Sequence, residues 1–187
     1  MSKRIFDEFI VWLRRKHPGE VVKVRDFIMY YIARLFGVVS MSASLGARVI
    51  RANGEVEDLG IVGTHVVTDV FAAALVDTLQ SAIAAFSDYK YHDDGTGTNV
   101  EAAADTALQT PCGEARNIGT QIEGATANIY KSVATHTYAG AFAITEHGLF
   151  NAAAAGTLMD RSVFTAINVA AADKIEFTYQ LTCTSGG

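Results

Sequence analysis

The strongest constraint on the fold lies near the end of the chain, in the ten residues KIEFTYQLTC (174–183). Apolar and polar side chains alternate there, with apolar residues at every second position: Ile175, Phe177, Tyr179, Leu181 and Cys183. Because successive side chains of a β-strand point to opposite faces, this pattern predicts a strand with one buried and one solvated face. Such strands are typical of antiparallel sheets. We therefore expect a mainly β fold in which Cys183 packs as an apolar residue and is not a nucleophile.

Shorter β-like runs with turns between them occupy most of residues 38–187. The run at 47–51 is followed by Asn53-Gly54, a strong signal for a hairpin turn, and by a returning strand at 56–59. The other expected strands are residues 61–67, 88–92, 128–138, 141–146, 149–150 and 162–168. Residues 95–109 are expected to form a polar connection that contains one helical turn. Together these strands predict an antiparallel β-sandwich or a jelly-roll-like domain.

One internal helix is expected among the strands. Residues 70–86, VFAAALVDTLQSAIAAF, carry an apolar stripe at helical spacing. Either Thr68 or Asp69 can cap its N-terminus, since both side chains accept a hydrogen bond from the first free backbone N–H groups. Its many alanines allow close packing against a sheet.

The N-terminal part has a different pattern. Residues 3–16 and 23–36 each place apolar side chains on one face of a helix, and His17-Pro18-Gly19 separates them. We expect residues 1–37 to form a helical arm and residues 38–187 a β-rich domain. Packing of the arm on itself, on the domain or on another subunit is favoured over binding to a membrane surface, which stays an alternative.

Charge divides along the same boundary. Residues 1–36 hold eight Lys or Arg and four acidic residues, whereas the remaining 151 hold seven and sixteen. The two parts therefore attract each other or a complementary partner, and the domain is too acidic for general nucleic-acid binding. The charged N-terminus argues against a signal peptide, and Lys23, Arg25, Asp26 and Arg34 argue against a membrane span.

The stretch YHDDGTGTN (91–99) invites a metal or phosphate interpretation. Consecutive strand residues such as His92, Asp93 and Asp94 point to alternate faces, so they rarely converge on one ion. The segment 95–98 lacks the lysine and the spacing of a phosphate loop. We therefore expect no metal or phosphate site here. The preferred interpretation is a strand end followed by a polar turn, in a loop that touches a neighbouring subunit.

The acid–base pair Glu146-His147 is the second candidate for chemistry. Adjacent residues of a strand diverge and do not reach one substrate atom, so a catalytic dyad is disfavoured. Glu146 is expected instead to pair with Arg116 or Arg161. His65 and His136 are expected to be structural histidines. Cys112 and Cys183 are expected to be free thiols without a metal. We predict no catalytic, cofactor-binding or metal-binding residues, no cofactor and no enzymatic activity.

Several segments resemble structural proteins of tailed bacteriophages. They are the YH strand end, GTGT, DTAL, GEAR, NIYKSVAT, ITEHGLF, LMDRSVF and the final alternating strand. The segment RANGEVEDLGIVG also fits, so the resemblance extends over roughly residues 49–182. It does not include residues 1–40.

This resemblance implies a non-enzymatic virion component, most like a capsid decoration (cement) protein on the head surface. It also implies a homo-oligomer, with a trimer favoured, that binds the major capsid protein or other virion proteins. A tail, neck or fibre component is the alternative. A host-glycan-binding module is a further possibility, with the loop at residues 113–127 as its candidate site. We expect no specific nucleic acid and no membrane among the partners.

Overall fold

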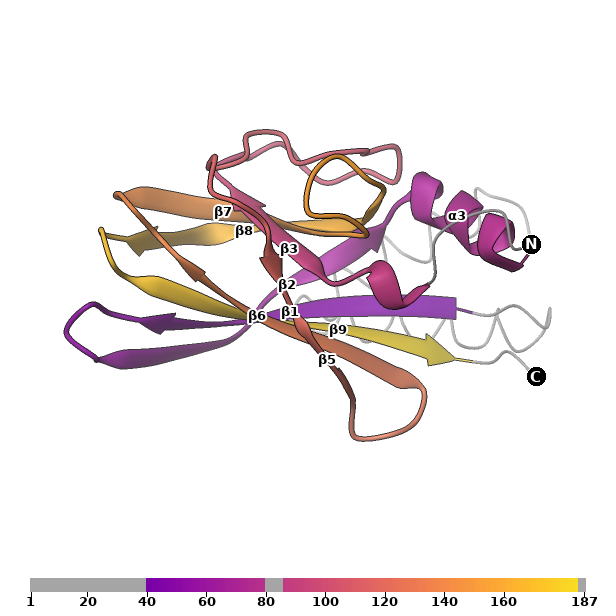
Figure 1. Ribbon diagram of the computed structural model, residues 1–187, viewed down its shortest axis with the longest axis horizontal. Helices are drawn as coiled ribbons and strands as arrows, with labels where there is room; N and C mark the ends of the chain where they lie inside the picture. Colours follow the sequence, from indigo (N-terminus) through magenta and orange to yellow (C-terminus); the bar gives the residue numbers. More distant parts are fainter. Residues whose placement is uncertain (1–39, 80–85, 185–187) are drawn as a thin grey trace, which may run out of the picture. The chain divides into compact units, whose positions relative to one another are not determined.

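The computed structural model describes residues 40–79 and 86–184 (Figure 1). The chain divides into two compact units: Met41–Thr182 forms one, and Met1–Ser40 with Cys183–Gly187 forms the other. The predicted helical arm at residues 1–37 lies outside the described residues. The described residues therefore belong to the unit Met41–Thr182, apart from the ends of its first and last strands.

The unit is mainly β, as the sequence predicts, with two antiparallel sheets and one short helix. The strands are β1 (Ser40–Ile50), β2 (Val56–Val67), β3 (Tyr91–Gly95), β4 (Asn117–Ile118), β5 (Thr120–Glu123), β6 (Ile129–Thr137), β7 (Phe142–Phe150), β8 (Leu158–Val169) and β9 (Lys174–Thr184). Their hydrogen-bonded order is β4-β3-β7-β8-β2-β1-β9-β6-β5. Figure 1 shows β3, β7 and β8 in one layer, with β1, β9 and β6 in the other.

Strand β2 belongs to both sheets. Its first part pairs with β1 in a hairpin, and its last two residues, Val66 and Val67, pair with β8. The predicted Asn-Gly turn is confirmed, because Gly54 has a φ of 88° and its N–H donates to Arg51 O at 2.9 Å. Gly60, with a φ of 63°, lies near an irregularity in the β1–β2 register. That glycine lets two predicted short strands run on as one.

A second crossover between the sheets lies within residues 113–127, which the sequence predicts to be a loop. Strand β4 pairs with β3 at one end of the strand order, and β5 pairs with β6 at the other end. Only Gly119 separates β4 from β5. We call residues 117–123 the corner segment, because the chain passes there from one sheet to the other, as strands do at the corners of packed sheets.

The core lies between the two sheets. Strand β9 has its predicted facing: Ile175, Phe177 and Tyr179 are fully buried, and Leu181 is nearly so. Ile175 and Phe177 pack in one cluster with apolar residues of β1, β7 and β8, among them Leu45, Val49, Ile144, Phe164 and Ile167. Burying large apolar side chains from both layers is the main force that holds the sheets together.

The internal helix α3 (Asp69–Leu79) begins as predicted. Thr68 is its N-cap, since Thr68 Oγ1 accepts a hydrogen bond from the N–H of Phe71 at 3.3 Å. The predicted helix extends to residue 86, but residues 80–85 lie outside the described part and Phe86–Asp88 forms a 3₁₀ turn. No helix within residues 40–79 and 86–184 has the length and apolar character needed to cross a bilayer.

Strand β3 differs from its prediction in position. The sequence pattern predicts a strand at residues 88–92 and a turn at residues 93–95, whereas β3 spans Tyr91–Gly95. Asp93 and Asp94 are therefore strand residues, and the expectation of a polar turn at residues 93–95 was wrong. The reason lies in the tertiary structure. Strand β3 pairs with β4 on one side and with β7 on the other, and the two aspartates bond to side chains of the surrounding strands and loops.

Candidate functional site: a polar cluster between the sheets

The two motifs that attracted attention in the sequence meet in space. Strands β3 and β7 are antiparallel neighbours, with His92 opposite Leu149 and Asp94 opposite His147. Paired residues of neighbouring strands share a face, so His92, Asp94 and His147 all point between the sheets. All three are fully buried. They form the centre of what we call the polar cluster, which also includes Cys112, Ser132, His136 and Tyr138.

The two histidines bond to each other. His92 Nδ1 lies 3.0 Å from His147 Nε2, and His92 Nε2 lies 2.8 Å from Ser132 Oγ on β6. One of the two facing ring nitrogens must carry the hydrogen, and the other must accept it. The His147 ring also packs on Phe177 of β9, with ring centroids 4.7 Å apart. The pair thus links four strands of the interior: β3, β7, β6 and β9.

Asp94 is the acceptor at the other end of the cluster. Tyr138 Oη donates to its Oδ2 at 2.8 Å, and the Cys112 thiol donates to its Oδ1 at 2.8 Å. His136 Nδ1 lies 3.0 Å from Asp94 Oδ2, and its Nε2 lies 3.1 Å from the backbone oxygen of His92. His136 is therefore a structural histidine with an oxygen next to each nitrogen, as predicted.

Burial and the aspartate change the acidity of these groups. Loss of solvation raises the pKa of Asp94, and the opposing charge of His136 partly offsets this rise. Burial, followed by the nearby Asp94 carboxylate, raises the pKa of Cys112 to about 12. The same two causes raise the pKa of Tyr138. Cys112 is thus a hydrogen-bond donor at neutral pH, with too little thiolate to act as a nucleophile.

The opposite faces of β3 and β7 hold the charged pairs. Arg116 Nε donates to Asp93 Oδ2 at 3.0 Å, while its guanidinium lies 3.4 Å from the ring centroid of Phe150. Glu146 pairs with Arg161 at 2.8 Å, so the second of its two predicted partners is the observed one. The expected divergence of Glu146 and His147 is confirmed, because one faces Arg161 and the other faces His92.

Glu146 also organises the loop that follows β3. Its carboxylate accepts backbone N–H groups from Gly97 at 3.1 Å, Gln109 at 3.0 Å and Thr110 at 2.7 Å. The glycine-rich stretch at 95–98 therefore presents a backbone N–H to an anion, but that anion is the protein's own carboxylate. This loop is irregular, with a single hydrogen-bonded turn from Ala102 to Asp105 in place of the predicted helical turn.

The arrangement favours a structural role for these side chains. Catalysis by a histidine or carboxylate requires contact with a substrate atom, and these groups contact each other inside the fold. Within the described ranges, no group of three or more His, Cys, Asp or Glu is placed to hold a metal ion. Cys112 and Cys183 are free thiols, as expected. His65 lies on β2, and its side chain is outside the described part.

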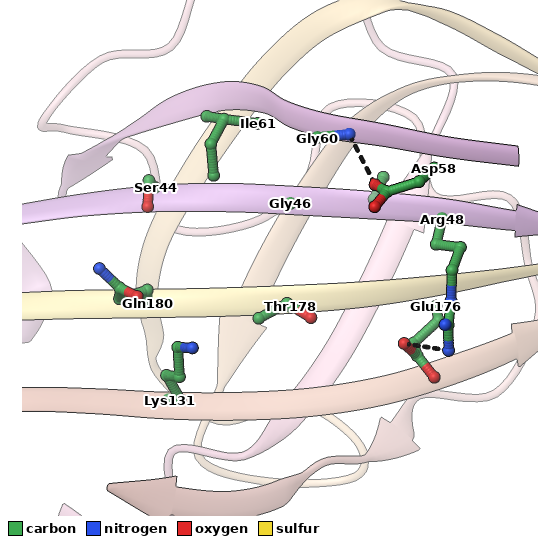
Figure 2. Close-up of a pocket in the computed structure, with 11 residues that line it drawn as sticks. Ser44, Gly46, Arg48, Asp58, Gly60, Ile61, Lys131, Glu176, Thr178 and Gln180 are labelled. Carbon is green, nitrogen blue, oxygen red and sulfur yellow. Dashed lines mark hydrogen bonds and ion pairs between the residues drawn. The ribbon is translucent and has the colours of Figure 1, made fainter. Parts of the chain in front are cut away.

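An open hollow of about 320 Å³ lies on the outer face of the sheet that contains β1, β2, β6 and β9 (Figure 2). Its floor is low because Gly46 and Gly60 carry no side chain, and Arg48 and Glu176 form an ion pair at 2.8 Å along its rim. The other polar side chains that line it are Ser44, Asp58, Lys131, Thr178 and Gln180. No local motif in the sequence predicts this hollow, because its residues come from four separate strands.

Comparison of the chain with models of protein families, with curated proteins and with solved structures gave no match.

Proposed function

We propose that this chain is a non-enzymatic structural protein of a tailed-bacteriophage particle, built on a β-sandwich with an N-terminal helical arm. The sequence resemblance favours the outer head surface, where the chain would act as a homo-oligomeric decoration protein that binds the major capsid protein in the virion. A trimer is the favoured oligomer. A tail, neck or fibre position is the alternative within the same class.

One structural observation supports a structural role over an enzymatic one. The acid–base side chains of the two conspicuous motifs are engaged in internal bonds: His92 with His147, Asp94 with His136, and Glu146 with Arg161. A substrate would have to displace these bonds to reach the groups. Buried polar side chains that bond to one another favour one rigid native arrangement, which is what a protein that reinforces a shell needs.

Charge supports an assembly role for the N-terminal segment. Residues 1–36 carry a net charge of +4 in a chain whose total is −5, so the rest of the chain is strongly acidic. Opposite charges on two parts of one chain favour contacts between copies as well as within a copy. The segment is therefore the proposed arm that connects a subunit to its neighbours or to the shell.

The decisive experiment is detection and removal in purified virions. Mass spectrometry of gradient-purified particles is expected to find the chain at a copy number comparable to the shell proteins. Particles lacking it are expected to assemble but to rupture at lower temperature, and addition of the purified full chain is expected to restore them. Absence of the chain from purified virions would exclude this function.

A matched pair of variants tests the arm. Deletion of residues 1–36 is expected to leave the β-rich domain folded by circular dichroism and to abolish its binding to heads. An Arg48→Ala variant of the full chain, which changes an exposed side chain of the β-domain, is expected to bind heads normally. Equal binding by all three proteins would contradict the role given to the arm.

A glycan-binding module is the second candidate, and the hollow in Figure 2 is the observation that favours it. Its rim offers paired charges, hydroxyls and an amide, which are the groups that hydrogen-bond to sugar hydroxyls. This site differs from the loop at 113–127, part of which forms the corner segment. A glycan array that shows binding by the full chain and loss in Lys131→Ala would support this function, and an array without hits would remove it.

A further inference from the structure

The histidine pair lies directly beneath the corner segment. The main chain at Gly119 passes so close to the pair that a Cβ there would lie 2.7 Å from His92 Nε2 and would collide with Ser132 Oγ. The segment is tied down on both sides: Gly119 N–H donates to Lys90 O at 2.7 Å, and Asn117 Nδ2 donates to Thr135 O at 3.0 Å. The position of the His92 ring therefore limits where the corner segment can lie.

We propose that the His92–His147 pair is an acid-sensitive lock that holds the corner segment, residues 117–123, across the two sheets. This inference does not depend on the proposed function. In its locked form the pair shares one hydrogen between two ring nitrogens, and its release frees β4 and β5 from the ends of their sheets.

The geometry permits only a limited number of protons. Two imidazole nitrogens 3.0 Å apart can share one hydrogen, whereas two hydrogens would point at each other. His92 has its second nitrogen on a hydroxyl, Ser132 Oγ, which can donate or accept. The pair can thus be neutral or singly charged while it stays bonded, but double protonation breaks it and places two like charges together without solvent.

His136 provides the contrast within the same cluster. Each of its nitrogens lies beside an oxygen that can accept a hydrogen, Asp94 Oδ2 at 3.0 Å and the His92 carbonyl at 3.1 Å. Neither nitrogen of this ring faces another ring nitrogen. Acid is expected to act on the His92–His147 contact and to leave the His136–Asp94 contact in place.

Among the described residues, the other ionisable groups around the pair come from β3, β6, β8 and β9 and from the loop that carries Cys112. Asp94 and His136 lie on β3 and β6, Cys112 and Tyr138 lie beside Asp94, Asp160 of β8 shares the inward face with His147, and Tyr179 of β9 pairs with Ser132. The pairs Asp93–Arg116 and Glu146–Arg161 lie on the opposite face. A nearby carboxylate favours the first proton on the pair, but the facing nitrogens still exclude the second.

The sign of the pH effect follows from proton counting. A histidine held neutral in the folded chain binds a proton in the unfolded chain below its ordinary pKa of about 6.5, so folding stability falls as the pH falls. Asp94 has the opposite effect: its raised pKa means that the folded state holds the extra proton, so this group favours folding as the pH falls. A loss of stability between pH 6.5 and 4.5 that disappears when His147 is replaced therefore reports on the pair.

The first experiment is denaturant unfolding of the full chain at several pH values. From one ring held neutral against an unfolded-state pKa of about 6.5, we expect the unfolding equilibrium constant to rise by about fivefold from pH 6.5 to 5.5 and by about ninefold from pH 5.5 to 4.5. Asp94 offsets part of this rise. Amide hydrogen exchange in the same range is expected to accelerate first in residues 117–123. A flat stability profile, or exchange that starts elsewhere, would overturn the proposal.

The variant His147→Gln separates the lock from general stability. Glutamine keeps a nitrogen near the position of Nε2 but does not titrate. The rise of the unfolding equilibrium constant with falling pH is therefore expected to be smaller, by up to about tenfold per pH unit. The control Phe177→Leu removes no ionisable group, so it is expected to lower stability and to keep the wild-type slope. An unchanged slope in His147→Gln would contradict the lock.

A measurement on the wild-type chain guards against a variant that does not fold. Imidazole ¹⁵N and ¹³C chemical shifts at pH 5 distinguish neutral from charged rings. We expect at least one of His92 and His147 to remain neutral in the folded state. Two fully charged rings in a chain that keeps its corner segment protected from exchange would overturn the proposal.

Discussion

Two arginine–glutamate pairs in this chain have the same separation and opposite surroundings. Arg161 and Glu146 lie 2.8 Å apart with 3% and 0% of their side chains exposed, whereas Arg48 and Glu176 lie 2.8 Å apart with 45% and 27% exposed. The buried pair also binds three backbone N–H groups and organises a loop. The exposed pair lines an open hollow that water can enter. The comparison shows that burial and additional partners, not distance, decide what such a pair contributes.

The largest effect is expected from breaking the buried pair. Glu146→Ala leaves the Arg161 guanidinium buried without its acceptor and removes the acceptor of Gly97, Gln109 and Thr110 N–H. We expect a loss of about 5 kcal/mol of unfolding free energy, the upper end for a broken buried pair. Chemical denaturation measures it. A loss below about 1 kcal/mol would mean that water or neighbouring groups replace the carboxylate.

A comparable but smaller loss is expected where the polar cluster meets the apolar core. Phe177 is fully buried and packs on His147 and Phe164. Phe177→Ala is expected to lower the unfolding free energy by about 3–5 kcal/mol, because it leaves a cavity that the two sheets cannot close. Thr178→Ala on the other face of β9 is the matched control, with an expected change within about 0.5 kcal/mol.

The corner segment is expected to respond to a single methyl group. In Gly119→Ala the new Cβ meets Ser132 Oγ and His92 Nε2, and the segment must shift outward. Overpacking of this kind costs about 1–3 kcal/mol, which thermal and chemical unfolding can measure. The neighbouring Thr120→Ala change is exposed and is expected to be nearly neutral. A neutral Gly119→Ala would show that the corner segment does not press on the histidine pair.

Asp173 offers a comparison that depends on pH. The N–H groups of Ala170 and Ala52, followed by Arg51, lower the pKa of this carboxyl at the β8–β9 turn. A lowered pKa means that its contribution is present above the ordinary value of about 3.8 and is lost as the pH falls through the folded-state value. Asp173→Asn is expected to be less stable than wild type at pH 6, and the gap should narrow in strong acid. A constant gap from pH 6 to pH 2 would contradict this account.

The smallest effect is expected from the exposed pair. Arg48→Ala removes the ion pair with Glu176 on the rim of the hollow, and water replaces the lost contact. We expect a loss of about 0–1 kcal/mol, which decreases further when salt is added. A loss above about 2 kcal/mol would show that the outer face of the sheet is less hydrated than its exposure indicates.

Local patterns were sufficient for several parts of the fold. The alternation of β9, the Asn-Gly hairpin and the helix cap depend on residues within a few positions of one another. The first two were predicted, and the cap was predicted as either Thr68 or Asp69. The divergence of Glu146 and His147 also follows from strand geometry alone. Strand β3 was predicted too early in the chain because its aspartates resemble turn residues when their distant partners are unknown. The corner segment was missed because strands of two and four residues carry almost no periodic signal.

The sequence alone therefore established a mainly antiparallel β-domain and the facing of its last strand. These conclusions depend on the alternation of side chains between the two faces of a strand, which can be recognised within a few consecutive residues. Only the tertiary structure decided that His92 contacts His147, 55 positions away, and that Gly119 crosses above them. Such contacts are set by strand register and by the spatial order of the strands in the described part of the chain, and no single motif determines either of these.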